Sequence, residues 1–282
     1  MTRPMTELVR NVSDTARWVA TYRARESART DALFTDPFAE RMAGDRGRSI
    51  ANAASPHSEW AIITRTKLID DVVRDLLAEG TDAILNLAAG FDTRPYRLDL
   101  PESLRWVEAD LPALVAEKEQ LLAGEKPRCR LERVAVDLSD PGALTAFLDR
   151  YTEGARRAAV ITEGLVIYLE PSSVAGLGRA LLACSRVSSW VLDFNSPRIQ
   201  TEISRGMRDT LANAPFKFAP PNGLAFFEAL GWKTRATRSL FREGARLKRV
   251  PLLMRPFALL PEPNPRDLKN GRWSAVARFD RG

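Results

Sequence analysis

The sequence predicts an α/β fold in which a mostly parallel sheet carries helices on both faces. Between residues 81 and 195, short apolar runs alternate with helical stretches, which is the pattern of βαβ units with strands buried on both faces. Gly90 follows the first run, where a turn from strand to helix can bring the backbone close to a ligand. The chain has 282 residues, enough for one large domain with a sizeable core.

Each element follows from its local pattern. Apolar residues before residue 81 recur at steps of three and four, which indicates helices, and Ser55-Pro56 is a typical start for a helix that ends at Gly80. Strands are predicted over Ala83–Leu87, Leu104–Val107, Leu131–Val136, Ala158–Thr162, Trp190–Phe194 and Trp273–Phe279. Helices are predicted near 112–123, 141–150, 171–186, 198–213 and 223–230, and a proline-rich loop over Ala214–Asn222. Residues 239–272 give no clear pattern.

Composition excludes several classes of protein. The chain is 45% hydrophobic and 28% charged, as in ordinary globular proteins. No apolar run reaches the roughly 18 residues of a transmembrane helix, and the N-terminus lacks the apolar stretch of a signal peptide. We therefore expect a cytoplasmic protein with no membrane partner. Two cysteines, Cys129 and Cys184, and a single histidine, His57, are too few for a zinc site, so no metal is expected.

Charge is distributed unevenly along the chain. Residues 1–195 have a net charge of −4, whereas residues 196–282 have 17 basic and 7 acidic groups, a net charge of +10. Five arginines in this last part recur at helical spacing and are predicted to form one basic helix face: Arg235, Arg238, Arg242, Arg246 and Arg249. Such a face is usually only solvated, but it can also bind an anionic substrate, a carrier or a nucleic acid.

Acidic residues follow several of the predicted strands. Asp110 stands twenty residues after Gly90 and could accept hydrogen bonds from both hydroxyls of a ribose. Asp137 follows the third strand, and Glu163 interrupts an otherwise apolar stretch, where a carboxylate is costly unless it faces a cleft or a partner. Asp92 and Arg94 either pair to brace the turn or shape the floor of a pocket. Together these residues predict a site for a nucleoside-containing cofactor.

Several motifs together give the chain a specific resemblance to a known family. They are Thr15–Phe38 (TARWVATYRARESARTDALFTDPF), Arg65-Thr66, Ala89–Leu98 (AGFDTRPYRL), Glu108-Ala109-Asp110, Val136-Asp137-Leu138 and Thr162–Leu169 (TEGLVIYL). With these motifs the chain resembles the leucine carboxyl methyltransferase family of S-adenosylmethionine-dependent methyltransferases, in particular a bacterial, polyketide O-methyltransferase-like branch.

This resemblance implies a fold and its division. The fold is the class I methyltransferase Rossmann-like fold, with a seven-stranded, mostly parallel sheet and an N-terminal helical lid. Residues 1–80 would form the lid, packed on a cofactor-binding core over 81–282. Substrate-side insertions would lie at about 196–222 and 239–272 within one structural domain.

The resemblance also implies roles for individual residues. Arg65 corresponds to the arginine that pairs with the methionine carboxylate of S-adenosylmethionine, which suits a bidentate guanidinium. The other implied contacts are Gly90 through its backbone, Asp110 to the ribose, Asp137 and Leu138 to the adenine, Glu163 near the methionine end, and Arg23 or Arg25 as a further basic contact. Ala88-Ala89 precede Gly90 where the family usually has a second small residue or glycine.

The chemistry of methyl transfer limits what the enzyme must supply. A sulfonium leaving group is already activated, so alignment and water exclusion matter most. A carboxylate acceptor is ionised at neutral pH and needs no base, whereas a phenol or alcohol would need one, with His57, Asp92 or Glu163 as candidates. Tyr168 could point its hydroxyl at the substrate, although a core position is equally compatible, and His57 could simply be solvated. Tyr168 and His57 are thus the candidate catalytic residues.

The expected function is O-methylation of a carboxylate or acidic hydroxyl on a small molecule, such as a polyketide or another secondary metabolite. A protein C-terminal carboxyl methyltransferase is an alternative within the same chemistry. An NAD(P)-dependent oxidoreductase would share the glycine turn and Asp110, but the chain lacks both a full GxGxxG and a Tyr-x-x-x-Lys pair. An RNA-binding or RNA-modifying protein would use the basic C-terminal third, and no nucleic-acid partner is expected. A protein that binds the cofactor without catalysis is also compatible with the sequence.

Overall fold

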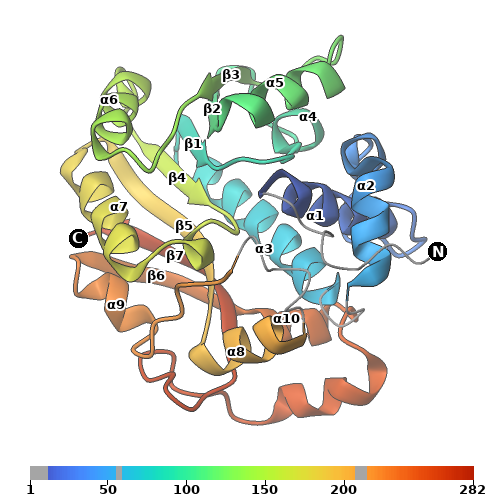
Figure 1. Cartoon of the computed structure of the whole chain (residues 1–282). Coiled ribbons are helices and arrows are strands. Elements are labelled where there is room, and N and C mark those ends of the chain that lie inside the picture. The colour runs from blue at the N-terminus through green and yellow to red at the C-terminus, as the bar shows by residue number, and fades with distance from the viewer. Residues whose placement is uncertain (1–11, 55–58, 207–214) are drawn as a thin grey trace.

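A computed structural model describes residues 12–54, 59–206 and 215–282 (Figure 1). Its centre is a seven-stranded sheet with the strand order β3-β2-β1-β4-β5-β7-β6. The strands are β1 (Ala83–Leu87), β2 (Arg105–Asp110), β3 (Arg130–Ala135), β4 (Ala158–Thr162), β5 (Val187–Asn195), β6 (Trp232–Ser239) and β7 (Ser274–Arg281). β7 runs antiparallel to its neighbours β5 and β6, and the pairings among β1 to β5 are parallel. The predicted mostly parallel, seven-stranded sheet is confirmed.

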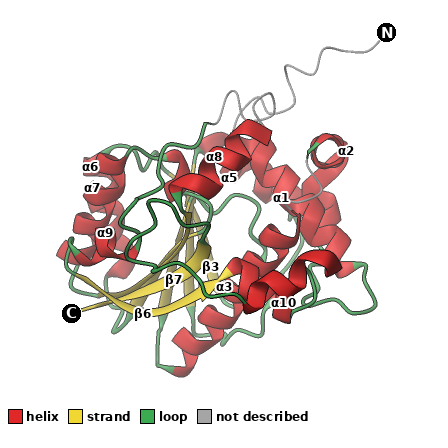
Figure 2. Ribbon diagram, turned by 90° about the horizontal axis from the view of Figure 1, so that it is seen from below, coloured by secondary structure: helices red, strands yellow, loops and turns green. Residues whose placement is uncertain are grey.

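Helices cover both faces of this sheet. They are α1 (Val12–Ser27), α2 (Ala39–Ala53), α3 (Glu59–Ala78), α4 (Arg94–Arg97), α5 (Pro112–Leu121), α6 (Pro141–Thr152), α7 (Pro171–Ala183), α8 (Pro197–Gly206), α9 (Leu224–Glu228) and α10 (Leu240–Arg246), with short 3₁₀ helices η2 (Val166–Tyr168) and η3 (Leu252–Leu259). Figure 2 shows α6, α7 and α9 on one side of the sheet and α3 and α10 on the other.

Alternation along the strands explains the two layers of core. Leu85 and Leu87 of β1 pack in the cluster under α6, α7 and α9, whereas Ile84 packs in the cluster under α3. Successive side chains of a strand point to opposite faces, so a run that is apolar at every position fills both layers. Proline at the first position begins α5, α6 and α7, and the Asp140 side chain caps α6 by accepting from the Gly142 amide.

The N-terminal helices α1 and α2 cross at very close range. A Cβ added to Gly47 of α2 would lie 2.5 Å from the carbonyl oxygen of Arg17 in α1, so the crossing requires glycine. Trp18 and Tyr22 of α1 pack against Ile50 of α2. The opposite side of α1 reaches the turn after β1, where Ala16 lies 3.3 Å from the place of a Cβ on Gly90. This packing fixes α1 over the carboxyl end of β1 (Figure 1).

The C-terminal third departs most from the sequence-based prediction. The prediction that five arginines form one basic helix face is wrong: Arg235 and Arg238 lie on β6, Arg242 and Arg246 on α10, and Arg249 beyond it. β6 has few apolar residues because much of it is exposed and it pairs only with β7. The arginines also pair with carboxylates of other segments, as Arg249 does with Glu26 at 2.7 Å.

Some predicted elements fall on or next to residues outside the described part. Ser55-Pro56, the predicted helix start, is not among the described residues, and α3 is described from Glu59. The helix predicted near 198–213 is described as α8, up to Gly206. Residues 239–272 contain α10, η3 and connecting loops. None of the described helices combines the length and the hydrophobicity that a membrane span requires.

Candidate functional site

A cavity of about 1690 Å³ lies at the carboxyl ends of the parallel strands. Open α/β sheets bind their ligands at this edge, because the loops that follow the strands meet there. The lining includes the loops after β1, β2, β3 and β4, the end of β5, and residues of α1, α3, α8 and η3. The structure thus brings together all the described residues that the sequence analysis assigned to cofactor binding.

The turn after β1 is tied to the end of β2. The Gly90 amide donates a 2.7 Å hydrogen bond to Oδ2 of Asp110, and the Leu111 amide donates one of 2.8 Å to Oδ1. Ala88 and Gly90 both have positive φ, +53° and +49°, so the turn bends sharply and exposes its backbone to the cavity. Burial raises the pKa of Asp110 above its ordinary value although both amides oppose this. Each oxygen still has a lone pair that a hydroxyl group could use.

The loop after β3 forms the next part of the lining. Asp137 and Leu138 both line the cavity, two and three residues beyond the end of the strand. The Ser139 hydroxyl hydrogen-bonds to Asp137, and the Ser139 amide donates a 2.9 Å bond to Oδ1; together they lower the pKa of this exposed carboxyl. An ionised carboxylate has about four lone-pair sites, so Asp137 can still accept from an exocyclic amine.

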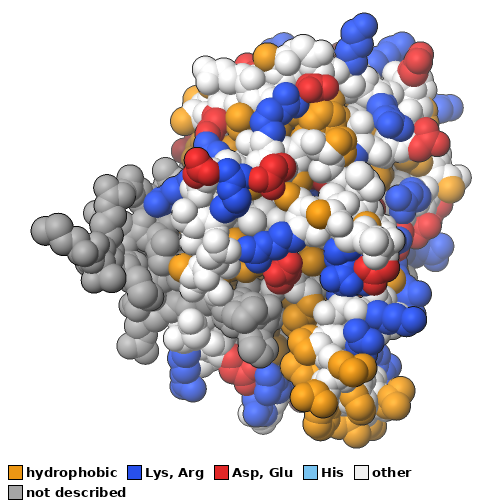
Figure 3. Space-filling view, turned by 90° about the vertical axis from the view of Figure 1, so that its right-hand side faces the viewer, with side chains coloured by type: hydrophobic (Ala, Val, Ile, Leu, Met, Phe, Trp, Pro, Cys, Tyr) orange, Lys and Arg blue, Asp and Glu red, His pale blue; other side chains and the backbone are white. Residues whose placement is uncertain are grey.

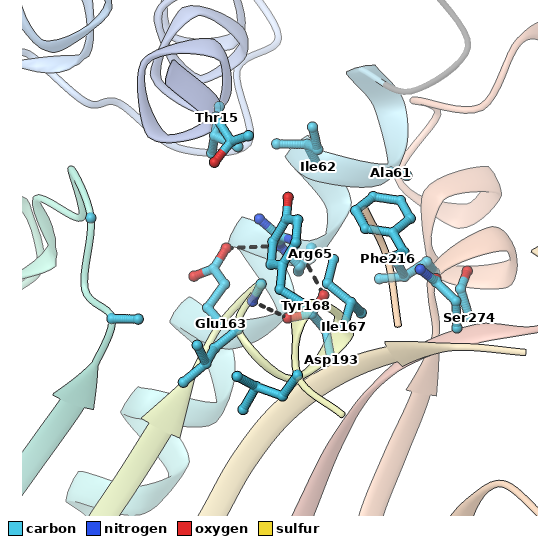
Figure 4. Close-up of a pocket in the computed structure, with 18 of the residues that line it drawn as sticks. Thr15, Ala61, Ile62, Arg65, Glu163, Ile167, Tyr168, Asp193, Phe216 and Ser274 are labelled. Atoms are coloured by element: carbon cyan, nitrogen blue, oxygen red, sulfur yellow. Dashed lines mark hydrogen bonds and ion pairs between the residues drawn. The ribbon is translucent and has the colours of Figure 1, made fainter. Parts of the chain in front are cut away.

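Arg65 of α3 is held between two carboxylates (Figure 4). Its Nε lies 2.9 Å from Oε1 of Glu163, directly after β4, and its Nη1 lies 3.1 Å from Oδ2 of Asp193 in β5. Burial disfavours the charged guanidinium, but Asp193 and Glu163 outweigh it and raise the pKa of Arg65. Nη2 makes no hydrogen bond to a described residue, so it is open to a ligand. Gly164 has a φ of +65° and lies against the guanidinium.

A second arginine joins Glu163 to the turn after β1. Nη1 of Arg94 lies 2.7 Å from both Asp92 and Glu163, and its Nε lies 2.7 Å from Asp70 of α3. Burial would raise the pKa of Glu163, but Arg94 and Arg65 lower it below the ordinary value. Asp92 and Arg94 therefore do both things considered for them: they pair within the turn and they line the cavity.

Tyr168 belongs to an aromatic and aliphatic wall of the cavity. Its ring packs edge to face against Phe216, with centroids 5.3 Å apart, and beside Ile62 of α3. Its hydroxyl points toward Thr15 of α1 (Figure 4). Burial raises the pKa of Tyr168 to about 12. Tyr168 is thus a neutral hydrogen-bonding group at physiological pH and is not a base.

The sequence left open whether Arg23 or Arg25 makes the further basic contact, and the structure distinguishes the two. Arg23 lines the cavity, donates to Asp36 at 2.8 Å and also donates to the carbonyl oxygen of Phe91 in the turn after β1. Arg25 lies on the surface and pairs with Glu59. Arg23 is therefore the arginine at the site. His57, the other catalytic candidate, lies outside the described residues.

Three buried charges at the site were not predicted from the sequence. They are Asp193, which holds Arg65, and Asp70 with Arg97, which complete the network around Arg94. Asp193 interrupts the apolar run of β5 as Glu163 interrupts its own stretch, so the same signal could have identified it. Asp70 is fully buried on the apolar face of α3, which is an equivalent signal on a helix.

Comparison with known proteins gives a consistent result. The family description leucine carboxyl methyltransferase matches residues 16–181. A protein of Streptomyces coelicolor that carries the name S-adenosyl-L-methionine-dependent methyltransferase is 32% identical, over 94% of this chain and 95% of its own length. A protein of Frankia alni with the same description is 31% identical, over 78% of this chain and 82% of its own length.

Two solved structures share the fold. A DUF574 family protein from Streptomyces avermitilis is similar with a TM-score of 0.63 and 18% identity, over 95% of this chain and 97% of that one. A methyltransferase structure from Thermobifida fusca is similar with a TM-score of 0.58 and 16% identity, over 94% of each chain.

Proposed function

The chain belongs to the leucine carboxyl methyltransferase family of S-adenosylmethionine-dependent methyltransferases, and from this premise we propose that it methylates a carboxylate or acidic hydroxyl of a small molecule. S-adenosylmethionine supplies the methyl group, on a positively charged sulfur. The cavity volume of about 1690 Å³ exceeds the roughly 300–1,000 Å³ of a typical single-ligand site, so it has room for an acceptor beside the cofactor.

The order of the strands supports a cofactor that lies along the edge of the sheet. Asp137 follows β3, Asp110 ends β2, Gly90 follows β1 and Glu163 follows β4, and these four strands are consecutive neighbours. Neighbouring strands are roughly 4.8 Å apart, so the row from β3 to β4 spans about 14 Å. An extended nucleoside with an amino-acid chain would find its adenine, ribose and methionine contacts in this order.

The chemistry of the side chains fits the same ligand. Asp110 can accept from ribose hydroxyls, and the open Nη2 of Arg65 can donate to the methionine carboxylate. The buried network around them has one more carboxylate than guanidinium groups, which favours a cationic ligand. Its members are Asp70, Asp92, Glu163 and Asp193 with Arg65, Arg94 and Arg97.

One observation supports an acceptor that is ionised before it binds. Every carboxylate that lines the cavity within the described residues is already paired with an arginine or bonded by a backbone amide: Asp92, Asp110, Asp137, Glu163, Asp193, Glu202 and Glu262. Tyr168 holds its proton up to a pH of about 12. An acceptor that is already ionised needs no base, so the paired state of these carboxylates and the neutral Tyr168 support a carboxylate or an acidic hydroxyl as the acceptor.

The remaining surfaces would position the acceptor and exclude water. Tyr168, Phe216 and Ile62 form an apolar wall that suits a ring or an aliphatic chain. We propose that α1 acts as the lid, since it contributes Thr15 and Trp18 to the lining and packs on the turn that holds Gly90. Transfer of the methyl group depends more on its alignment with the acceptor and on the exclusion of water than on a catalytic acid or base.

A methyl-transfer assay over a panel of acceptors tests this proposal. The protein is incubated with S-adenosylmethionine labelled in its methyl group and with aromatic and aliphatic carboxylic acids, phenols, their methylated counterparts, and a peptide with a free C-terminal carboxylate. We expect label in base-labile esters or in ethers of acidic phenols. Transfer to the peptide alone would favour the protein C-terminal alternative, and transfer only to amines would reject O-methylation.

A further inference from the structure

The segment after α10 exposes an unusual number of large apolar side chains. Of the residues that the structure describes, those with the highest apolar exposure are almost all here: Leu252 (72%), Leu253 (87%), Phe257 (60%), Leu259 (86%) and Leu260 (58%). We call these five residues of and next to η3 the η3 patch. Figure 3 shows hydrophobic side chains gathered at the lower edge of the molecule, where they project from the surface. A single exposed leucine needs no explanation, but five within nine residues indicate a binding surface.

Basic residues precede and interrupt the η3 patch in the sequence. Residues 244–261 contain Arg246, Lys248, Arg249 and Arg255 and no acidic residue. Lys248 is exposed and forms no ion pair with a described residue, and Arg255 bonds only to the carbonyls of Val250 and Lys248 within the described part of the chain. Arg246 and Arg249 are paired with carboxylates, so Lys248 and Arg255 are the two cations that the patch can offer to an anionic surface.

The η3 patch also forms one edge of the cavity. Phe257 and Leu260 line the cavity, as does Met254 between the exposed leucines. Leu253 and Leu259 are not part of this lining and point to solvent instead. A surface bound to the patch would thus lie directly at the opening of the site.

We propose that the η3 patch docks the protein on the surface of an anionic lipid bilayer, with the cavity opening toward the lipid. Apolar side chains that project beside cations are what an interfacial anchor needs, because the side chains enter the acyl boundary while the cations face anionic headgroups. A second copy of the chain fits less well, since a symmetric contact would bring the cations Lys248 and Arg255 of the two copies together. The most exposed side chains, Leu253 and Leu259, project into solvent and do not line the cavity.

This proposal goes beyond methyl transfer and does not depend on the identity of the acceptor. It departs from the sequence-based expectation of no membrane partner, which was based on the absence of a spanning run. An interfacial anchor needs no such run, because it enters only the headgroup and upper acyl region. Docking would give an amphiphilic acceptor direct access from the bilayer to the cavity.

Vesicle co-sedimentation tests the proposal on the full chain. Vesicles of phosphatidylcholine alone are compared with vesicles of phosphatidylcholine and phosphatidylglycerol, for the wild type, for Leu253→Gln/Leu259→Gln and for Lys248→Gln. We expect binding to the anionic vesicles, weakened at least about tenfold in the double leucine variant and about fivefold in Lys248→Gln. Lys126→Gln, in the exposed loop between α5 and β3, is the matched charge control and should bind as the wild type does.

Two further measurements separate the possible outcomes. S-adenosylhomocysteine binding should be unchanged in the double leucine variant, which shows that it is folded. No binding of the wild type to anionic vesicles, or equal binding of the wild type and the double variant, would overturn the proposal. Concentration-dependent self-association that the double variant loses would instead assign the η3 patch to a second copy and would also overturn it.

Discussion

The backbone amide of Gly90 donates a 2.7 Å hydrogen bond to Oδ2 of Asp110, so a single bond joins the turn after β1 to the end of β2. The glycine and the acid that the sequence suggested as separate cofactor contacts are therefore one structural unit. The carboxylate positions the turn and keeps lone pairs free for a ligand.

We expect Asp110→Ala to weaken binding of S-adenosylhomocysteine by about 1–3 kcal/mol, because a charged acceptor of hydroxyl protons is lost and the Gly90 amide loses its partner. Isothermal titration calorimetry of the wild type and the variant measures this change. Asp99→Ala is a matched control, because Asp99 is exposed and does not line the cavity. Unchanged affinity in a folded Asp110→Ala variant would remove Asp110 from the site.

The turn after β1 also allows a test of stability. Ala88 has a φ of +53°, a left-handed conformation that costs an L-residue roughly 1–2 kcal/mol and costs glycine nothing. We expect Ala88→Gly to raise the free energy of unfolding by about 0.5–1 kcal/mol, after the extra entropy of an unfolded glycine is deducted. Chemical denaturation measures the change.

The neighbouring residue provides the control for this substitution. Ala89 has no positive φ and is buried, so Ala89→Gly brings the entropic cost and the loss of a buried methyl group, and it should lower stability by about 1–2 kcal/mol. A loss of stability in both variants would show that the backbone at Ala88 is not strained.

Because α1 and α2 cross so closely, we expect one added methyl group to change the stability of the protein strongly. A Cβ at Gly47 would lie 2.5 Å from the Arg17 carbonyl oxygen and 2.8 Å from Oγ1 of Thr21, so Gly47→Ala must push the helices apart. We expect a loss of about 1–3 kcal/mol in the free energy of unfolding. Gly176→Ala in α7 makes the same chemical change where no atom lies within 4 Å, and it should stabilise by about 0.5–1 kcal/mol. Equal effects of the two substitutions would contradict the close crossing.

The sequence predicts the parallel half of the fold well for a physical reason. β1 and β4 are buried at every position, and such continuous apolar runs are visible without knowledge of their neighbours. β6 was missed because its partly exposed sequence, WKTRATRS, has no apolar run and is fixed mainly by its pairing with β7. A strand of this kind depends on tertiary contacts that local patterns do not contain.

At the candidate site, too, some features follow from local patterns and others depend on tertiary contacts. Asp110 and Glu163 could be identified because they stand at the ends of apolar runs, at the edge where ligands bind. The pairing of Arg65 with Asp193 joins residues 128 positions apart, and no local pattern predicts it. The motifs predicted which residues are near the cofactor, but the network that holds them requires the three-dimensional structure.

The raised pKa of Tyr168 leads to a prediction of how the rate of methyl transfer depends on pH. Since burial raises the pKa of its hydroxyl to about 12, the group stays protonated throughout the neutral range and acts only as a hydrogen-bonding partner. We expect Tyr168→Phe to lower the rate of methyl transfer by less than about tenfold, the effect of one neutral hydrogen bond. The rate profiles of both proteins between about pH 6 and 9 should have the same shape with a carboxylate acceptor, which is ionised throughout.

If Tyr168 were the base, the wild-type rate would rise with pH across this range and the variant would lose that rise. Steady-state rates across this range, measured for both proteins at saturating S-adenosylmethionine, distinguish the two roles.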